Sequence, residues 1–273
     1  MIVDAHHHLW DPAAADYPWL TDEVAPIRRR FAPEDLAPLL VARGVDATVV
    51  VQARASLDET HELLATAAAV PWLAGVVGWA DLTDPAIADV LAELRGEPLV
   101  GIRHQVHDEP DPAWLLRGDV GRGLRAVEQE GLVYDLLVRP RELPAAVEVA
   151  RRFPGLRLVV DHLAKPPLRD GDTAAWVEGL SGLAALPNVC CKLSGLVTEA
   201  AWDSWGPGEL VPYLRRALDW FGPERSLFGS DWPVCLLAAS YDEVVDLALA
   251  VLEPGERAAV MGGTAARLYR LDD

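Results

Sequence analysis

Ionisable side chains stand where several apolar segments of the sequence end, and two of them are spaced to bind one metal ion. His6 and His8 are two residues apart in a strand-like segment. Because side chains alternate along a strand, both imidazoles lie on one face and His7 lies on the other. Paired imidazoles are a common part of zinc sites. The sequence therefore predicts a metal site in which His162 and Asp231, from later segments, complete the ligand set.

Asp231 is also the residue that we expect to move protons. A carboxylate beside a metal ion or imidazoles can take a proton from water and later return it to a leaving oxygen. The alternative is a structural cap on the next segment, since Trp232 and Pro233 follow directly. We predict catalytic roles for Asp231, His162 and Arg103.

Arg103 and its neighbour His104 end another apolar segment. Arg103 is a permanent cation that can hold a carboxylate or polarise a carbonyl group. The alternative is a salt bridge to Asp135 or Asp81 inside the protein. In a regular strand only one of the two neighbours faces inward. Lys192, in a further segment, either hydrogen-bonds to substrate or neutralises an interior carboxylate.

Aromatic residues flank these polar positions. Their flat apolar faces suit a cyclic or sugar-like substrate, although the same residues can equally form a packed aromatic core. The predicted substrate-binding residues are Trp10, Trp79, Arg103, His104, Lys192 and Trp232.

The charge balance limits the classes of partner. The 273 residues include 24 Lys and Arg against 42 Asp and Glu, which gives a formal net charge of −18 with histidine neutral. Nucleic acids and acidic membrane surfaces are bound by clustered cations, so this composition argues against both. A neutral small molecule is the expected partner, and the sequence leaves a homo-oligomer open.

The cysteines and the N-terminal residues indicate the cellular compartment. Cys190, Cys191 and Cys235 are odd in number, and adjacent cysteines in a strand point to opposite faces. We expect reduced, mostly buried thiols whose further role the sequence does not indicate. The first residues contain no basic segment followed by a long apolar run, so no signal peptide is predicted. These features favour a cytoplasmic protein.

The elements that position these residues alternate along the chain. Short segments dense in Val, Leu and Ile are followed by segments of helical periodicity, and no linker divides the chain. The predicted strands are 2–6, 46–52, 74–80, 99–104, 132–138, 156–162, 189–194 and 226–231. The predicted helices lie near 33–43, 58–69, 84–94, 119–130, 141–152, 172–186, 207–221 and 240–252.

Eight strands that alternate with eight helices over this length predict an α/β fold, a single-domain TIM (β/α)8 barrel. A doubly wound sheet is the alternative, but it usually has fewer strands and a glycine-rich first turn, where this sequence has histidines. The carboxyl ends of the strands meet at one face of a barrel, so the polar residues above should meet there.

Two segments lie outside the repeat within the single domain 1–273. Residues 10–32 are long for a strand–helix connection and contain three prolines. We expect a lid or a substrate-binding loop over the barrel mouth. Residues 254–273 are expected to form a closing helix and a tail.

Several motifs together resemble one family. The sequence is similar to the sugar-lactone hydrolase branch of the amidohydrolase superfamily (amidohydrolase 2 type), which includes L-fuconolactonases and L-rhamnonolactonases, and the similarity covers nearly the whole chain. The family fold is a distorted (β/α)8 barrel. The motifs are DAHHHLWD at 4–11, YPWL at 17–20, FAPEDL at 31–36, GIRHQ at 101–105, DHLAKP at 161–166, CKLSGL at 191–196 and FGSDWP at 228–233.

The resemblance implies roles for individual residues. His6, His8 and Asp231 match the superfamily's histidine pair on the first strand and its aspartate on the last. His162 matches the single later histidine of this branch. A bridging carboxylated lysine or glutamate is absent, which implies one divalent ion, zinc by type. Some lactonases of this branch resemble metal-independent enzymes, in which Arg103 and the three histidines would polarise the ester carbonyl directly.

The resemblance also implies a reaction, the hydrolysis of an aldonolactone to the free sugar acid by water that Asp231 activates. One alternative is a metal-dependent decarboxylase on the same scaffold, which a second late histidine would favour. Another is a non-catalytic barrel that binds a sugar through its aromatic rim, for which eroded polar strand ends would be expected. The particular lactone and its ring size are not indicated.

Overall fold

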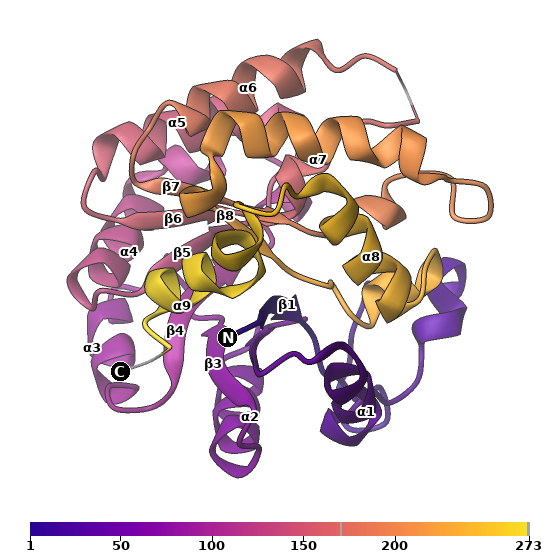
Figure 1. Ribbon diagram of the computed structural model, residues 1–273. Helices are drawn as coiled ribbons and strands as arrows, with labels where there is room; N and C mark the ends of the chain where they lie inside the picture. Colours follow the sequence, from indigo (N-terminus) through magenta and orange to yellow (C-terminus); the bar gives the residue numbers. More distant parts are fainter. Residues whose placement is uncertain (170, 272–273) are drawn as a thin grey trace.

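The computed structural model describes residues 1–169 and 171–271 of the chain. Eight parallel strands are hydrogen-bonded to one another in the order of the sequence. This arrangement confirms the predicted barrel and excludes the doubly wound sheet (Figure 1). The strands are β1 (Val3–His7), β2 (Ala47–Val51), β3 (Leu73–Gly78), β4 (Leu99–His104), β5 (Val133–Leu136), β6 (Arg157–Val160), β7 (Val189–Leu193) and β8 (Ser226–Phe228).

The barrel closes between the segment after β8 and the end of β1. The backbone N–H of Asp231 donates to the carbonyl of His6 at 2.8 Å, and the N–H of His8 donates to the carbonyl of Trp232 at 2.7 Å. Closure therefore places Asp231 next to His6 and His8, although it lies more than 220 residues after them in the sequence.

Helices follow the strands on the outside of the barrel (Figure 1). The predicted helix 84–94 is shorter than expected, because the Asp84 carboxylate accepts a hydrogen bond from the N–H of Ala86 in a turn and α3 starts only at Ile87. The helices are α1 (Pro33–Arg43), α2 (Leu57–Ala69), α3 (Ile87–Glu93), α4 (Gly118–Gln129), α5 (Leu143–Arg152), α6 (Ala174–Ala184), α7 (Pro207–Phe221), α8 (Tyr241–Val251) and α9 (Thr264–Tyr269).

Local sequence signals account for several helix ends. The Ser56 hydroxyl accepts a hydrogen bond from the N–H of Glu59 at the start of α2. Ser240 and Glu243 form a reciprocal capping box at the start of α8. Gly44 ends α1 with φ of 64°, a left-handed conformation that glycine adopts without strain.

Several strands end earlier than the sequence suggests, and after two of them, β6 and β8, a predicted site residue follows. β6 stops at Val160 instead of residue 162, because residues 162–165 all have positive φ between 49° and 56°. β8 stops at Phe228 instead of residue 231, and Asp231 has φ of 57°. In both cases the backbone leaves the sheet just where a predicted site residue stands.

The insert 10–32 folds back on itself. Trp10 and Phe31 pair in an antiparallel bridge, and Asp22–Ile27 forms a 3-10 turn with Ile27 buried. Its aromatic and aliphatic side chains join the main core, so the insert is packed onto the barrel.

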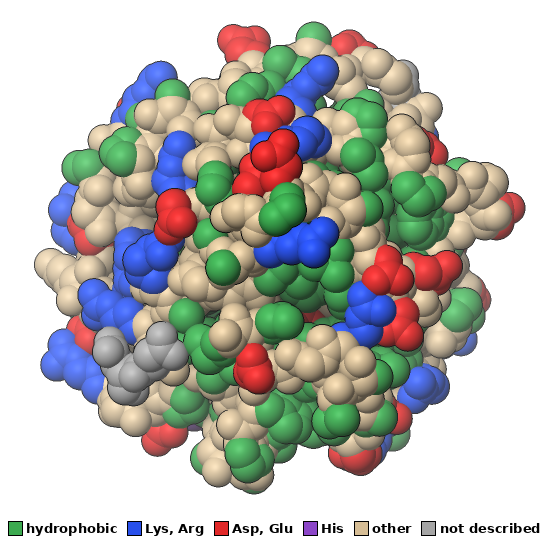
Figure 2. All heavy atoms as spheres, viewed as in Figure 1, with side chains coloured by type: hydrophobic (Ala, Val, Ile, Leu, Met, Phe, Trp, Pro, Cys, Tyr) green, Lys and Arg blue, Asp and Glu red, His purple; other side chains and the backbone are tan. Residues whose placement is uncertain are grey.

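The C-terminal segment lies at the amino end of the barrel. A π-helical turn, Ala259–Gly263, leads into α9, so the closing helix starts later than residue 254. α9 lies near the N-terminus in Figure 1, and Figure 2 shows acidic, basic and apolar side chains interspersed over this face. Residues 272 and 273 of the predicted tail lie outside the described residues.

The cysteines agree with the expectation for them. Cys190, Cys191 and Cys235 are all free thiols, and the last two are buried. Within the described residues, no helix is both long and apolar enough to cross a bilayer.

Candidate active site

The predicted catalytic and metal-binding residues converge at the carboxyl end of the barrel. They come from β1, from β4, from the turn after β6 and from the segment after β8. Each is at most 4 % exposed. Burial of so many ionisable groups is costly unless they pair or bind a ligand. The five residues are His6, His8, Arg103, His162 and Asp231.

Four candidate ligand atoms of this group lie close to one another. The Nε2 atoms of His6 and His8 lie 3.2 Å apart. Asp231 Oδ1 lies 3.7 Å from the first and 3.4 Å from the second. The Nε2 atom of His162 lies 3.8 Å from the same carboxylate oxygen. Imidazole nitrogens with one carboxylate are a donor set that zinc accepts.

Contacts on the far side of the ring orient two of the imidazoles, those of His8 and His162. His8 Nδ1–H donates to the carbonyl of Val51 at 2.7 Å, which leaves a lone pair on Nε2. His162 Nδ1 lies 2.9 Å from the hydroxyl of Ser194. Such outer contacts fix the ring orientation of histidines that bind metals.

Arg103 faces the interior and binds a carboxylate that the sequence did not indicate. Its Nη1 lies 3.0 Å from Asp161 Oδ2 and 3.3 Å from His6 Nε2. The salt bridge that we expected as an alternative, to Asp135 or Asp81, is therefore wrong in its partner. Asp81 is exposed and accepts hydrogen bonds from Thr83 instead.

Lys192 lies fully buried inside the barrel. Its ammonium group is 2.5 Å from Asp135 Oδ2, 3.0 Å from Asp161 Oδ1 and 3.1 Å from His6 Nδ1. The Tyr269 hydroxyl of α9 donates to Asp135 at 3.1 Å. Of the two roles considered for Lys192, these contacts match the neutralisation of interior carboxylates.

Burial keeps the imidazoles neutral at physiological pH. It lowers the pKa of His6 and of His8, and it lowers the pKa of His162 to about 4. For the Asp231 carboxyl, burial alone would raise the pKa, but His162, His8 and His6 outweigh it and the pKa is lowered. An ionised carboxylate among neutral imidazoles can bind a metal ion or accept a proton from water.

A strained turn presents His162 to this group. Residues 162–165 adopt the left-handed conformation without a glycine among them. Each such residue costs about 1–2 kcal/mol, and this kind of strain concentrates at functional sites. Gly195 allows the arrangement, because a Cβ there would lie 2.3 Å from His162 Nδ1.

The predicted aromatic residues fall into two groups. Trp10 and Trp232 are 3 % and 2 % exposed, and both pack edge-on against Phe31. Trp79 donates from Nε1 to His104 Nδ1 at 3.0 Å. These contacts match the packed aromatic core that we considered as the alternative, and a role in substrate binding stays a prediction.

His104 points away from the Asp231 group. Its Nε2–H donates to Glu109 at 2.7 Å, and its ring stacks on Trp114 with centroids 4.3 Å apart. Of the neighbours Arg103 and His104, the first faces inward, as alternation along β4 requires.

Asp161 and Ser194 have site contacts for which sequence reasoning assigned no role. Asp161 contacts Arg103 and Lys192, and Ser194 contacts His162. Both residues lie in motifs of the family resemblance, at 161–166 and 191–196, and that is the signal that could have identified them.

A cavity of about 730 Å³ lies among loops at the carboxyl end of the barrel. Its walls come from the insert and from the loops that follow β5, β6, β7 and β8. The segments after β6 and β8 also carry His162 and Asp231, which lie outside the cavity lining. We call this cavity the mouth cavity.

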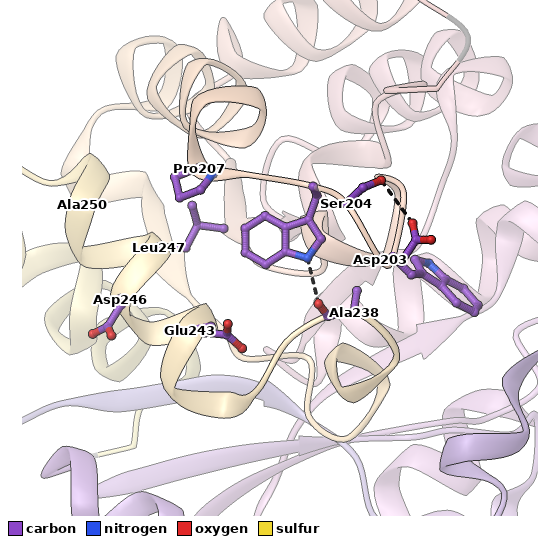
Figure 3. Close-up of a pocket in the computed structure, with 10 residues that line it drawn as sticks. Asp203, Ser204, Pro207, Ala238, Glu243, Asp246, Leu247 and Ala250 are labelled. Atoms are coloured by element: carbon purple, nitrogen blue, oxygen red, sulfur yellow. Dashed lines mark hydrogen bonds between the residues drawn. The ribbon is translucent and has the colours of Figure 1, made fainter.

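A second cavity, of about 500 Å³, lies between the segment before α7 and helix α8 (Figure 3). None of the strand-end residues lines it. Its acidic side chains serve within the protein, since Glu243 caps α8 and Asp246 pairs with Arg43. The five site residues do not line the mouth cavity either, but its walls at Lys165 and Val234 lie three residues after His162 and Asp231 in the chain. We therefore take the mouth cavity as the candidate substrate site.

The comparisons with known proteins agree with this fold. The model of the amidohydrolase family matches residues 3–271, and the chain belongs to this family. The chain is 45% identical to an L-fucono-1,5-lactonase from Burkholderia multivorans over 285 residues, which cover 99% of this chain and 96% of the relative. It is 42% identical to an L-fucono-1,5-lactonase from Burkholderia ambifaria over 282 residues, with the same coverage.

A solved structure of an amidohydrolase has the same fold as this chain. The crystal structure of an amidohydrolase from Burkholderia multivorans with bound zinc superposes with a TM-score of 0.92 at 45% identity. The superposition covers 99% of each chain.

Proposed function

We propose that this chain is a hydrolase that opens the ring of a sugar lactone to give the free sugar acid. The observation that carries the proposal is the convergence of Asp231 with three neutral imidazoles at the carboxyl end of the barrel. The full-length relatives named L-fucono-1,5-lactonase support a sugar lactone as the substrate. L-Fucono-1,5-lactone is therefore the first substrate to test.

Asp231 is the general base in this proposal. As a water oxygen attacks the lactone carbonyl carbon, the Asp231 carboxylate takes one proton from that water. The bond between the carbonyl carbon and the ring oxygen then breaks, and Asp231 returns the proton to the ring oxygen. The products are one hydroxyl group and one carboxylic acid on the opened chain.

Arg103 and His162 stabilise the charge that develops on the carbonyl oxygen. The Arg103 guanidinium stays charged throughout, and burial strengthens its effect on a nearby oxyanion. Asp161, at 3.0 Å, holds the guanidinium in place.

We propose that the cluster binds one divalent ion, zinc by type. His6, His8 and Asp231 offer donor atoms within 4.8 Å of one another, with His162 beside them. A bound ion would supply a Lewis acid for the carbonyl group. The zinc in the Burkholderia multivorans amidohydrolase supports this proposal. Arg103 Nη1 lies 3.3 Å from His6 Nε2. A fixed positive charge therefore lies beside the proposed metal site, whether or not an ion is bound.

Two further expectations become part of the proposal. We place the insert 10–32 over the substrate, because Trp19 and Val24 from it line the mouth cavity. We also place the protein in the cytoplasm, which the three free thiols support.

A pH-indicator assay with a panel of sugar lactones, with and without a chelator, tests the function. We expect proton release from at least one lactone, well above its spontaneous hydrolysis. Carbon dioxide release without ring opening would point to a decarboxylase, and no turnover of any lactone would overturn the proposal. Loss of activity with the chelator and its return with zinc would support the metal site.

A further inference from the structure

Lysine is rare in this chain. One lysine lies inside the barrel beneath the candidate active site, and the other lines the mouth cavity. Of the 24 Lys and Arg residues, only Lys165 and Lys192 are lysines. Lys192 is buried among interior carboxylates, whereas the Lys165 side chain is 17 % exposed and lines the mouth cavity. The mechanism proposed above gives Lys165 no role.

The strained turn after β6 aims Lys165 as well as His162. Both have positive φ, and the N–H of Lys165 donates to the carbonyl of His162 at 2.8 Å. The same unusual backbone therefore presents the His162 ring to Asp231 and the Lys165 side chain to the mouth cavity. Strain that persists in a fold is a sign that the positions it produces are used.

The mouth cavity has a positive lining in a protein of strongly negative charge. Four basic side chains, Arg139, Arg141, Lys165 and Arg169, line it against one acidic side chain, Glu199. The whole chain carries a formal charge of −18. The sign of the charge at the mouth is thus opposite to that of the molecule as a whole.

Glu199 neutralises only part of this charge. Its two carboxylate oxygens are shared between Lys165, at 3.1 Å, and Arg139, at 3.4 Å. The Arg169 guanidinium donates to the backbone carbonyl of Ala200 at 3.1 Å, and among the described residues it forms no salt bridge. Arg141 is paired with Glu142. Four cations against these two carboxylates leave a net positive charge around the cavity after internal pairing.

The other walls of the cavity suit a sugar chain. Trp19 and Trp202 supply flat apolar faces, and Thr198 supplies a hydroxyl group. Aromatic faces bind the apolar face of a sugar, while cations bind a carboxylate. The reaction proposed above converts a neutral lactone into a ligand with both features, a polyhydroxylated carboxylate.

We propose that Lys165 and Arg169 form a carboxylate-binding subsite in the mouth cavity, which holds the acid group of the opened sugar acid. The inference rests on the proposed function, because that reaction generates the ligand. Glu199 weakens the subsite by occupying Lys165. Product inhibition follows, and it is sensitive to salt because the subsite is partly exposed.

Product inhibition by the sugar acid of the best lactone substrate tests this subsite. Lys165→Met should raise the inhibition constant for the sugar acid at least fivefold, and by a clearly larger factor than it changes the KM for the neutral lactone, because the lactone carries no charge. Glu199→Gln should lower the inhibition constant, because it frees Lys165. Arg152→Met, which removes an exposed cation at the end of α5, is the matched control and should change neither value.

Labelling of Lys165 gives a readout that does not depend on turnover or on a variant. An amine-specific reagent should modify Lys165, since Lys192 is not exposed. Mass spectrometry should show at least fivefold protection by the sugar acid and none by the alditol with the same carbon chain. Unchanged inhibition in Lys165→Met, or equal labelling with and without the acid, would overturn the subsite. Product inhibition and protection from labelling can both be absent while the lactone is still hydrolysed. The experiments therefore distinguish failure of the subsite from failure of the proposed function.

Discussion

Asp231 connects the fold to the chemistry at the scale of a single residue. Its backbone closes the barrel through His6, and its carboxylate faces three imidazoles. Removal of the carboxylate charge should therefore stop the reaction without opening the barrel, because Asp231 contributes its backbone N–H, and not its side chain, to the closing bond with His6.

The first prediction concerns this carboxylate. Asp231→Asn keeps the shape of the side chain but cannot accept a proton from water, and we expect kcat for lactone hydrolysis to fall by roughly a thousandfold. Asp203→Asn, in the loop after β7, is the control and should keep full activity. Steady-state rates, with circular dichroism to verify the fold, measure the effect. Turnover near the wild-type rate would remove Asp231 from the mechanism.

A second prediction concerns Glu59, whose buried carboxylate accepts hydrogen bonds from the N–H groups of Ala53 and Arg54. Burial raises its pKa to about 7. A carboxyl with a raised pKa in the folded state stabilises the protein below its unfolded pKa, and this contribution is lost as the pH rises through 7. The free energy of unfolding should therefore fall by roughly 3 kcal/mol between pH 5 and 8 from this group.

Urea titrations at a series of pH values measure this dependence. Glu59→Gln should remove that part of the decline, whereas Glu62→Gln, an exposed position on the same helix, should leave it in place. Parallel pH profiles for wild type and Glu59→Gln would contradict the assignment.

Residue types and spacing were sufficient to find the members of the site but not their pairings. The alternation of side chains along β1 indicated that His6 and His8 share a face, and the structure agrees. The partner of Arg103 was not predictable, since Asp161 and Asp135 both lie near it in the barrel and only the register of β4 to β6 decides between them.

At the scale of elements, the turns after the strands matter more than the strands. β6 and β8 hold their apolar residues in the core, and the polar residues that follow leave the sheet through left-handed backbone. The sequence indicated strands through residues 162 and 231 because apolar periodicity contains no signal for positive φ in residues other than glycine.

The third prediction tests this positioning without removing any functional group. Gly195→Ala would place a Cβ 2.3 Å from His162 Nδ1, so the ring must move. We expect kcat/KM to fall by roughly a hundredfold, as small displacements of catalytic groups do. Gly208→Ala in α7, where a Cβ meets nothing within 4 Å, should leave it unchanged. Equal activity of the two variants would contradict a positioning role for Gly195.

At the scale of the whole molecule, buried charges connect the two ends of the barrel. Tyr269 of α9 contacts Asp135, which contacts Lys192, which contacts Asp161 beside Arg103. The closing helix at the amino end thus supports the charge balance beneath the site. Sequence reasoning placed this helix but could not assign its contact with Asp135, because that depends on three-dimensional closure.

The fourth prediction follows from this connection. Tyr269→Phe leaves the buried Asp135 with one donor fewer, and we expect the free energy of unfolding to fall by about 1–3 kcal/mol. Tyr213→Phe is the control, because its hydroxyl makes no hydrogen bond within the described part of the chain, and it should change stability little. Urea unfolding measures both variants; equal stability would show that the hydroxyl is dispensable.

The net charge of the chain did not indicate the local charge around the mouth cavity. A charge of −18 indicated a neutral small-molecule partner, whereas the mouth cavity has a basic lining. Composition cannot indicate such segregation, because it depends on which loops the barrel brings together.

Ring opening of L-fucono-1,5-lactone by the purified chain tests the central proposal most directly. Proton NMR distinguishes the lactone from the open acid and allows subtraction of spontaneous hydrolysis. We expect the open sugar acid to form at a rate proportional to the enzyme concentration. Disappearance of that lactone at only the spontaneous rate, with the other sugar lactones of the panel equally unaffected, would contradict the proposed function.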